Sequence, residues 1–131
     1  MRLVPMLASV AALYNFGWGS DQPALYVKEV GQRAMYVAVR RYEGVTDPQK
    51  VAQLVEEGFI PIISEMPGFV AYYFVDAGDG VMVSTSVFEH KDAEEQSNFR
   101  AGEFVAEHLA PLMPNPPQIT GGEVGVYKAS P

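Results

Sequence analysis

The amino-acid sequence predicts an α+β fold of the ferredoxin-like type, in which a four-stranded antiparallel sheet carries two helices on one face. Apolar residues in 35–127 follow strand and helix periods in the order strand, helix, strand, strand, helix, strand. A hairpin sequence at residues 76–80 joins the middle strands, and a proline cluster stops the second helix. With 131 residues, the chain is long enough for one such domain but not for two.

The first strand is predicted over residues 35–42, where side chains alternate between two faces. One face is wholly apolar, with Met35, Val37 and Val39. The other is aromatic and partly polar, with Tyr36, Ala38, Arg40 and Tyr42. Because helices usually cover apolar surface, we expect the first face to lie under the helices and the second to point away from them.

Asp47 followed by Pro48 predicts the start of the first helix, because the acid caps free backbone N–H groups and proline suits the first turn. Its expected buried stripe is Val51, Leu54, Val55, Phe59 and Ile62. Gly58 and Pro61 predict a kink, and the helix should end before Pro67.

Residues 69–75 and 81–88 are predicted to form a hairpin around a turn that contains two glycines. We expect Phe69, Ala71 and Tyr73 to share the helix side with Val83, Thr85 and Val87. The opposite face would hold Val70, Tyr72, Phe74, Met82, Ser84 and Ser86. A bulge in the first of these strands would exchange its two faces.

The second helix is predicted from about Asp92 to Leu112. The acids Asp92, Glu94 and Glu95 suit a solvated first turn. The expected buried stripe is Ala93, Ser97, Ala101, Phe104, Val105, His108 and Leu112. Prolines at 111, 114, 116 and 117 should end the helix, and residues 123–127 are predicted to form the last strand.

Composition excludes several classes of function. A net charge of −7 and a pI near 4.7 disfavour nucleic acid as a partner, which requires basic residues to neutralise phosphates. Without cysteine, the chain has no disulfide and no thiolate metal site or nucleophile, which fits a cytoplasmic protein. His90 precedes the second helix and His108 lies within it, about 24 Å along its axis from Asp92, so we expect no metal site.

Residues 1–34 are expected to be an N-terminal extension of a domain that spans residues 35–131. The apolar run at residues 3–13 has one positive charge, contains Pro5 and lacks a small-residue cleavage site, so a signal peptide is not expected. The run is also too short to cross a membrane, which takes about 20 residues.

The sheet face expected to point away from the helices holds the candidate ligand-binding residues. It combines aromatic rings and hydroxyls with one guanidinium, that of Arg40, a combination that suits a flat, partly anionic ligand such as a phenol or quinone. The alternative is a filled interface between two copies of the chain. The candidate substrate-binding residues are Tyr36, Tyr42, Tyr72, Phe74, Ser84, Ser86, Phe88 and Tyr127.

Three segments resemble the antibiotic biosynthesis monooxygenase-like family: the first strand, Pro67-Gly68-Phe69 at the entry to the second, and Ser86-Val87-Phe88-Glu89 before an acid-rich helix. The resemblance spans residues 35–127. It implies a homodimeric α+β barrel with a cavity on each sheet and, in some members, oxidation of phenolic polyketides without a cofactor, or haem degradation. Haem-degrading members carry asparagine on the first strand, and tryptophan and histidine on the second helix. Here Arg40 and Arg41 lie on that strand, Trp18 is the only tryptophan and His108 matches the histidine only approximately, so haem chemistry is not expected.

The function expected from this resemblance is a cofactor-independent monooxygenase that acts on a small aromatic, phenolic or quinone-like substrate. Arg40 would stabilise a phenolate, and a neutral His108 would accept its proton if it reaches the cavity. The interpretation that the helical spacing favours is a histidine at the edge of the core. The alternative function is a non-enzymatic homodimeric module that binds a small molecule or serves a structural role.

Overall fold

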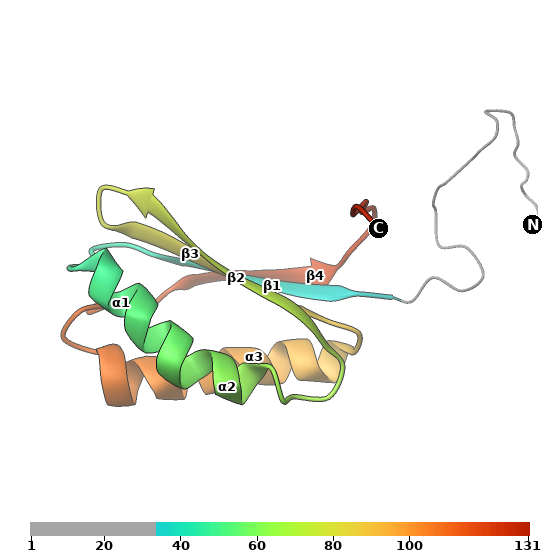
Figure 1. The fold of residues 1–131 in the computed structure, drawn as a ribbon, viewed down its shortest axis with the longest axis horizontal. Helices are drawn as coiled ribbons and strands as arrows, with labels where there is room; N and C mark the ends of the chain where they lie inside the picture. The colour runs from blue at the N-terminus through green and yellow to red at the C-terminus, as the bar shows by residue number, and fades with distance from the viewer. Residues whose placement is uncertain (1–33) are drawn as a thin grey trace, which may run out of the picture. The chain divides into compact units, whose positions relative to one another are not determined.

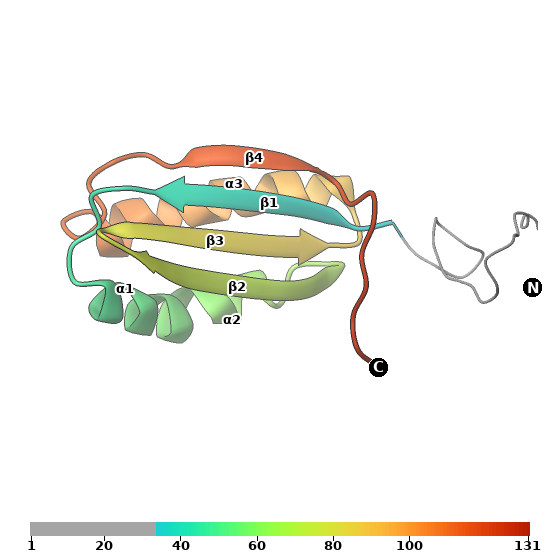
Figure 2. The same ribbon diagram turned by 90° about the horizontal axis from the view of Figure 1, so that it is seen from above.

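The structure is a computed structural model that describes residues 34–131. Residues Ala34–Val124 form one compact unit. The N-terminal extension and the apolar run expected there lie outside the described residues, except for Ala34. Within the compact unit the sheet order is β2-β3-β1-β4 with antiparallel pairing, and both helices lie against one face (Figures 1 and 2). The predicted ferredoxin-like α+β fold is confirmed.

The two central strands are β1 (Tyr36–Tyr42) and β3 (Val81–Phe88), and β2 (Phe69–Gly78) and β4 (Gln118–Glu123) form the edges. The predicted hairpin between β2 and β3 is confirmed, and its turn places Gly78, Asp79 and Gly80 at positive φ. The prediction for the last strand is wrong in position. It pairs with β1 from Gln118 onward, and Gly125–Pro131 fall outside the compact unit. Glycines 121 and 122 are tolerated because the strand lies at an edge.

The first helix is interrupted by a wider π turn, and the second helix ends in one. The first consists of α1 (Pro48–Leu54), η1 (Val55–Phe59) and α2 (Ile60–Ile63), and the second of α3 (Lys91–Phe104) and η2 (Val105–Leu109). The predicted cap is confirmed, since the Asp47 carboxylate accepts a hydrogen bond of 3.2 Å from the Lys50 amide. The π turn η1 directly precedes Pro61, so the first helix passes the proline without ending.

The π turns shift the buried stripes by one position relative to a regular helix. Ile63 is fully buried whereas Ile62 is 39% exposed, which corrects the predicted stripe of the first helix. In the second helix, Leu109 and Met113 are buried in place of the predicted His108 and Leu112. A π turn adds a residue to the turn, so a period of 3.6 applied through it selects the wrong neighbour.

The alternation along β1 and β3 is confirmed, but the predicted orientation of the sheet is inverted. The side chains that face the helices are Ala38, Arg40, Tyr42, Met82, Ser84, Ser86 and Phe88, all of them buried. The aliphatic face with Val37 and Val39 points away from them. The physical reason is that the helix surface is itself polar where it meets Arg40, so burying the mixed face leaves its polar groups hydrogen bonded.

A bulge near the start of β2 places Val70 out of register between Phe69 and Ala71. Phe69 therefore pairs with Phe88, and their rings meet edge to face with centroids 5.9 Å apart. The prediction that Phe69 shares a face with Ala71 is wrong for this reason. Beyond the bulge Tyr72 and Phe74 share a face with Ser84 and Ser86, as predicted. The register differs by two residues from a pairing of Val75 with Val81, since Val75 pairs with Val83 and Tyr72 with Ser86.

Among residues 34–131, none of the helices has the length and apolar character needed to cross a membrane. The core lies between the sheet and the two helices, and aromatic rings join its parts. Phe59 from the first helix contacts Tyr72 from β2 and Phe104 from α3, at centroid distances of 5.6 and 5.5 Å.

The corrected helix register makes a testable prediction. Ile63→Ala should lower the free energy of unfolding by about 2–5 kcal/mol, because it opens a cavity in the core. Ile62→Ala, its exposed neighbour, should cost less than about 1 kcal/mol. Chemical denaturation of both variants measures the difference, and a larger loss for Ile62→Ala would contradict the register.

Candidate functional site

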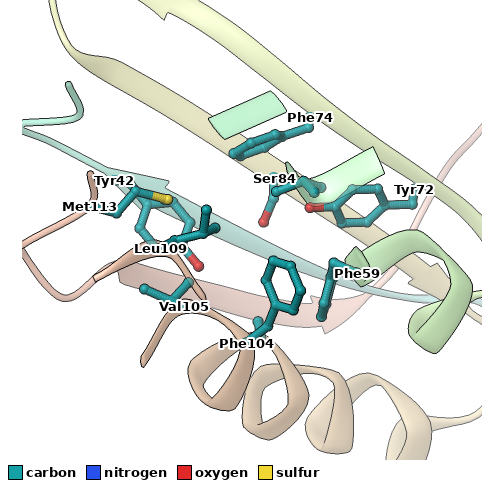
Figure 3. A pocket seen from close by; sticks show the side chains of 11 residues that line it. Tyr42, Phe59, Tyr72, Phe74, Ser84, Phe104, Val105, Leu109 and Met113 are labelled. Atoms are coloured by element: carbon teal, nitrogen blue, oxygen red, sulfur yellow. The ribbon is translucent and has the colours of Figure 1, made fainter. Parts of the chain in front are cut away.

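A pocket lies between the sheet and the two helices, inside one copy of the chain (Figure 3). Its walls are mostly aromatic and aliphatic, with the hydroxyls of Tyr42, Tyr72 and Ser84 as the polar groups. Both π turns contribute to its lining. The lining residues are Tyr42, Val55, Phe59, Tyr72, Phe74, Ser84, Ala101, Phe104, Val105, Leu109 and Met113. An apolar pocket with a few fixed polar groups is typical of small-molecule sites.

The pocket is narrow as it stands. The space open to a water-sized sphere is about 20 Å³, which holds roughly one water molecule. An aromatic ligand therefore needs its walls to move. The wall on the helix side can move, because Met113 has a flexible side chain and Val105 and Leu109 belong to a π turn.

The Arg40 guanidinium lies buried behind the pocket, with 1% of the residue exposed. Nη1 donates to Ser84 Oγ at 2.9 Å and to Ser86 Oγ at 3.1 Å. Nη2 donates to Ser97 Oγ at 2.8 Å, and Nε donates to Asn98 Oδ1 at 2.9 Å. All three nitrogens are thus held by neutral acceptors from β3 and α3. Burial lowers the pKa of Arg40, while Tyr42, Tyr72 and Glu94 raise it.

The direction of the hydrogen bonds carries the influence of Arg40 into the pocket. Arginine only donates, so Ser84 accepts from it and keeps its own O–H for another acceptor. Ser84 and Tyr72 both line the pocket, and Ser84 lowers the pKa of the Tyr72 phenol, as an O–H directed at the phenol oxygen would. Figure 3 shows the Tyr72 hydroxyl pointing toward Ser84. The O–H of Tyr72 is then left to donate to a ligand.

Burial raises the pKa of Tyr72 to about 12, although Arg40 and Ser84 partly oppose the effect. Tyr72 is therefore a neutral donor at physiological pH. Burial also raises the pKa of Tyr42, which is 4% exposed. Within residues 34–131 the Tyr42 hydroxyl has no hydrogen-bond partner. A buried hydroxyl without a partner in a pocket is available to a ligand or to water.

Glu94 is buried, which corrects its prediction as part of a solvated first turn. It is 5% exposed and lies one helical turn before Asn98, the residue that accepts from Arg40. Burial and then Glu95 raise the pKa of Glu94, whereas Lys91, Arg40 and Asn98 lower it. Glu94, Ser97 and Asn98 form a polar strip on the inward side of α3.

The predicted site residues divide into two groups. Tyr42, Tyr72, Phe74 and Ser84 line the pocket, although this pocket lies under the helices and not on the opposite face of the sheet. The others do not line it. Arg40 and Ser86 lie behind it, Phe88 belongs to the core beside Phe69, Tyr36 is half-buried on β1, and Tyr127 lies beyond the last strand and is 48% exposed.

His108 lies outside the pocket. Its side chain is 55% exposed, and its ring rests on Phe104 at a centroid distance of 4.8 Å. Glu107 approaches it at 3.7 Å. The prediction that it belongs to the buried stripe is wrong, because the π turn brings Leu109 to that position. In residues 34–131 no group of three or more acidic or histidine side chains is placed to hold a metal ion.

Sequence reasoning missed the helix side of the pocket and the residue that contacts Arg40 Nε. The missed lining residues from the helices are Val55, Phe59, Ala101, Phe104, Val105, Leu109 and Met113. The sequence did contain a signal for the contact between the second helix and Arg40. Glu94, Ser97 and Asn98 recur at spacings of three and four, which places three polar residues on one face of a helix whose buried stripe includes Ala93 and Ala101. A polar strip there predicts a polar partner on the sheet.

Comparison with solved structures shows which proteins share this fold. NE2512, a protein of unknown function from Nitrosomonas europaea, matches with a TM-score of 0.61 and 16% identity, over 76% of this chain and 97% of that one. The monooxygenase ActVA-Orf6 of Streptomyces coelicolor, in complex with nanaomycin D, matches with a TM-score of 0.52 and 24% identity, over 75% and 93%. SnoaB of Streptomyces nogalater, a cofactor-independent oxygenase, matches with a TM-score of 0.52 and 18% identity, over 74% of this chain and 97% of that one.

The structural neighbours of this chain thus include antibiotic biosynthesis monooxygenase-like proteins, the family that the sequence resembles. At these identities the likeness shows the fold. No protein-family model matches the sequence, and neither does any curated protein.

The Arg40 network makes a testable prediction. Arg40→Met should lower the free energy of unfolding by about 3–5 kcal/mol, because it leaves buried acceptors and the Glu94 carboxylate without their cation. Arg100→Met is the matched control. Arg100 is exposed on α3, so its loss should cost less than about 1 kcal/mol. Denaturant titrations of the two variants measure both, and equal losses would contradict a buried role for Arg40.

Proposed function

We propose that this protein is a cofactor-independent monooxygenase with an antibiotic biosynthesis monooxygenase-like domain, acting on a small phenolic or quinone-forming aromatic in the pocket. The observation that carries the proposal is the buried Arg40 guanidinium, which donates to Ser84 next to the Tyr72 hydroxyl. Tyr72 is a neutral donor inside an apolar, aromatic pocket.

Tyr72 would donate to the substrate oxygen. A phenol that reacts with dioxygen first loses its proton, here to water because the pocket lining holds no histidine or carboxylate, and the negative charge then lies on the phenol oxygen. The Arg40 charge behind Ser84 favours that anion, and its effect is strong because the site is largely dry. Phe59, Phe74 and Phe104 would hold the ring of the substrate by its faces and edges.

The reaction balances without a cofactor when the substrate is its own reductant. In the reaction with dioxygen, 1-naphthol loses two hydrogens, one from the phenolic oxygen and one from the para carbon. One oxygen atom becomes the new carbonyl of 1,4-naphthoquinone, and the other leaves as water with the two hydrogens. The substrate supplies all the electrons. The protein binds the phenolate, orients the ring and excludes bulk water.

Two structural neighbours support this proposal by analogy. ActVA-Orf6 is a monooxygenase, and SnoaB is a cofactor-independent oxygenase. A fold does not define an activity, so the main support for the proposal is the pocket, and the neighbours give secondary support. A non-enzymatic module that binds the same class of ligand is the alternative. The absence of a histidine or carboxylate from the pocket lining favours it.

We propose further that the bare face of the sheet is covered by a second copy of the chain. This face carries Val37 and Val39 on β1, Val83, Thr85 and Val87 on β3, and Tyr73 and Val75 on β2. Tyr73 is 60% exposed and Val75 is 50% exposed within one copy. Monomers rarely leave an apolar sheet face open to water. A homodimer would cover it, and the lack of cysteine fits a cytoplasmic location for such a protein.

The proposed activity predicts that the protein binds 1-naphthol and, in air, converts it to 1,4-naphthoquinone. Tyr72→Phe should weaken 1-naphthol binding about tenfold, the effect of losing one good hydrogen bond. It should leave the binding of naphthalene unchanged, because naphthalene has no oxygen. Tyr73→Phe, on the opposite face of the sheet, is the matched control. Calorimetry measures binding, and mass spectrometry with heavy-isotope dioxygen should find one labelled oxygen atom in the quinone.

The outcomes of this experiment separate the two candidate functions. Binding of 1-naphthol that depends on Tyr72, without oxygen uptake, would support the binding module and exclude the monooxygenase for phenols of this kind. Equal affinity for 1-naphthol in wild type and Tyr72→Phe would remove Tyr72 from the site.

The proposed dimer predicts a single sedimenting species of twice the chain mass at micromolar concentration. Thr85→Asp places a charge in the middle of the bare face, between Val39 and Tyr73, and should produce monomers, because an unpaired charge cannot be buried in an apolar interface. Ile60→Asp is the control, since Ile60 is an exposed apolar residue on α2. A wild-type monomer in sedimentation velocity would overturn the dimer.

A further inference from the structure

We propose that Glu94 is a positioning residue for this site: it orients Asn98, Asn98 holds Arg40, and Arg40 through Ser84 prepares the Tyr72 donor. The inference deepens the proposed function and rests on it. It gives a role to a buried carboxylate that the oxidation itself does not use.

Small residues of the sheet make room for the Glu94 carboxylate. Ser86, Ala38 and Gly121 stand side by side across β3, β1 and β4. Three small residues in one row leave a hollow under the sheet. The Glu94 carboxylate lies at the β4 end of this row, where a Cβ atom on Gly121 would come within 2.7 Å of Oε2. Glycine at 121 is therefore what lets the carboxylate lie there.

Asn98 is held in one orientation. Arg40 Nε can only donate, so the Asn98 oxygen must face it. The amide nitrogen then faces the other way, toward the Glu94 carboxylate one helical turn earlier, and Asn98 lowers the pKa of that carboxyl. A carboxylate only accepts, so this arrangement has one consistent direction from Glu94 to Arg40. Ser97 adds to it by accepting from Nη2 and donating to the Glu94 carbonyl at 2.6 Å.

The charge of Glu94 also acts on Arg40. Arg40 is buried and all its hydrogen bonds in the described part of the chain go to neutral oxygens. Glu94 is the buried acid whose charge acts on Arg40. It therefore both compensates the guanidinium and, through Asn98, fixes the plane from which Nη1 reaches Ser84.

The test is a double-mutant cycle on the full chain. Glu94→Leu and Asn98→Leu should each weaken 1-naphthol binding about tenfold while the affinity for naphthalene stays unchanged. If Glu94 acts through Asn98, adding Glu94→Leu to Asn98→Leu should change the affinity less than about twofold. Glu95→Leu, the exposed neighbour, is the control and should have no effect. The Arg40 Nε–H resonance should exchange slowly with water in wild type and rapidly in Glu94→Leu.

A second pair of variants keeps the test valid if Glu94→Leu does not fold. Gly121→Ala should displace the carboxylate and speed Arg40 Nε–H exchange, whereas Gly122→Ala, which has open space around it, should not. Multiplicative losses in the double mutant, or equal losses for 1-naphthol and naphthalene, would overturn the inference. If wild type binds no 1-naphthol, the proposed function fails, and unchanged Arg40 Nε–H exchange in both Glu94→Leu and Gly121→Ala would separately overturn the positioning role.

Discussion

The buried guanidinium of Arg40 is the constraint on which the rest of the site depends. A charge removed from water must be held by oriented acceptors, and here two serines of β3 and two polar residues of α3 hold it. These bonds tie the second helix to the centre of the sheet. They also require the mixed face of β1 to lie under the helices, which leaves the aliphatic face of the sheet bare. One buried charge thus decides which side becomes the pocket and which becomes the proposed interface.

The π turns are the second determinant of the pocket. They lie in both helices, and residues of each, Val55 and Phe59 on one side and Val105 and Leu109 on the other, line the pocket. A π turn widens the helix locally and weakens its regular hydrogen bonding, and such turns are often found at functional sites. The same turns move His108 out of the pocket. The site that results relies on hydroxyls and one buried cation, with no imidazole in its lining.

How far the site was predictable differs from residue to residue. Tyr72, Phe74, Ser84 and Tyr42 were identified as a set because alternation groups residues of one strand face, and pairing in the hairpin joins the strands. Asn98 was not identified, since its role appears only when the helix meets Arg40. His108 was misplaced, because a regular helical period is wrong after a π turn. Phe69 was misplaced by the bulge at Val70.

By itself the sequence determined the order of the strands and helices, the hairpin, the capped start of the first helix and the residues that share a strand face. These follow from local rules of period, capping and turn chemistry. Only the tertiary structure decided which face of the sheet the helices cover. Alternation is symmetric between the two faces, and the choice depends on polar contacts between Arg40 and residues 57 and 58 positions away in the chain. The pocket exists between those faces, so its location could not be read from either strand or helix alone.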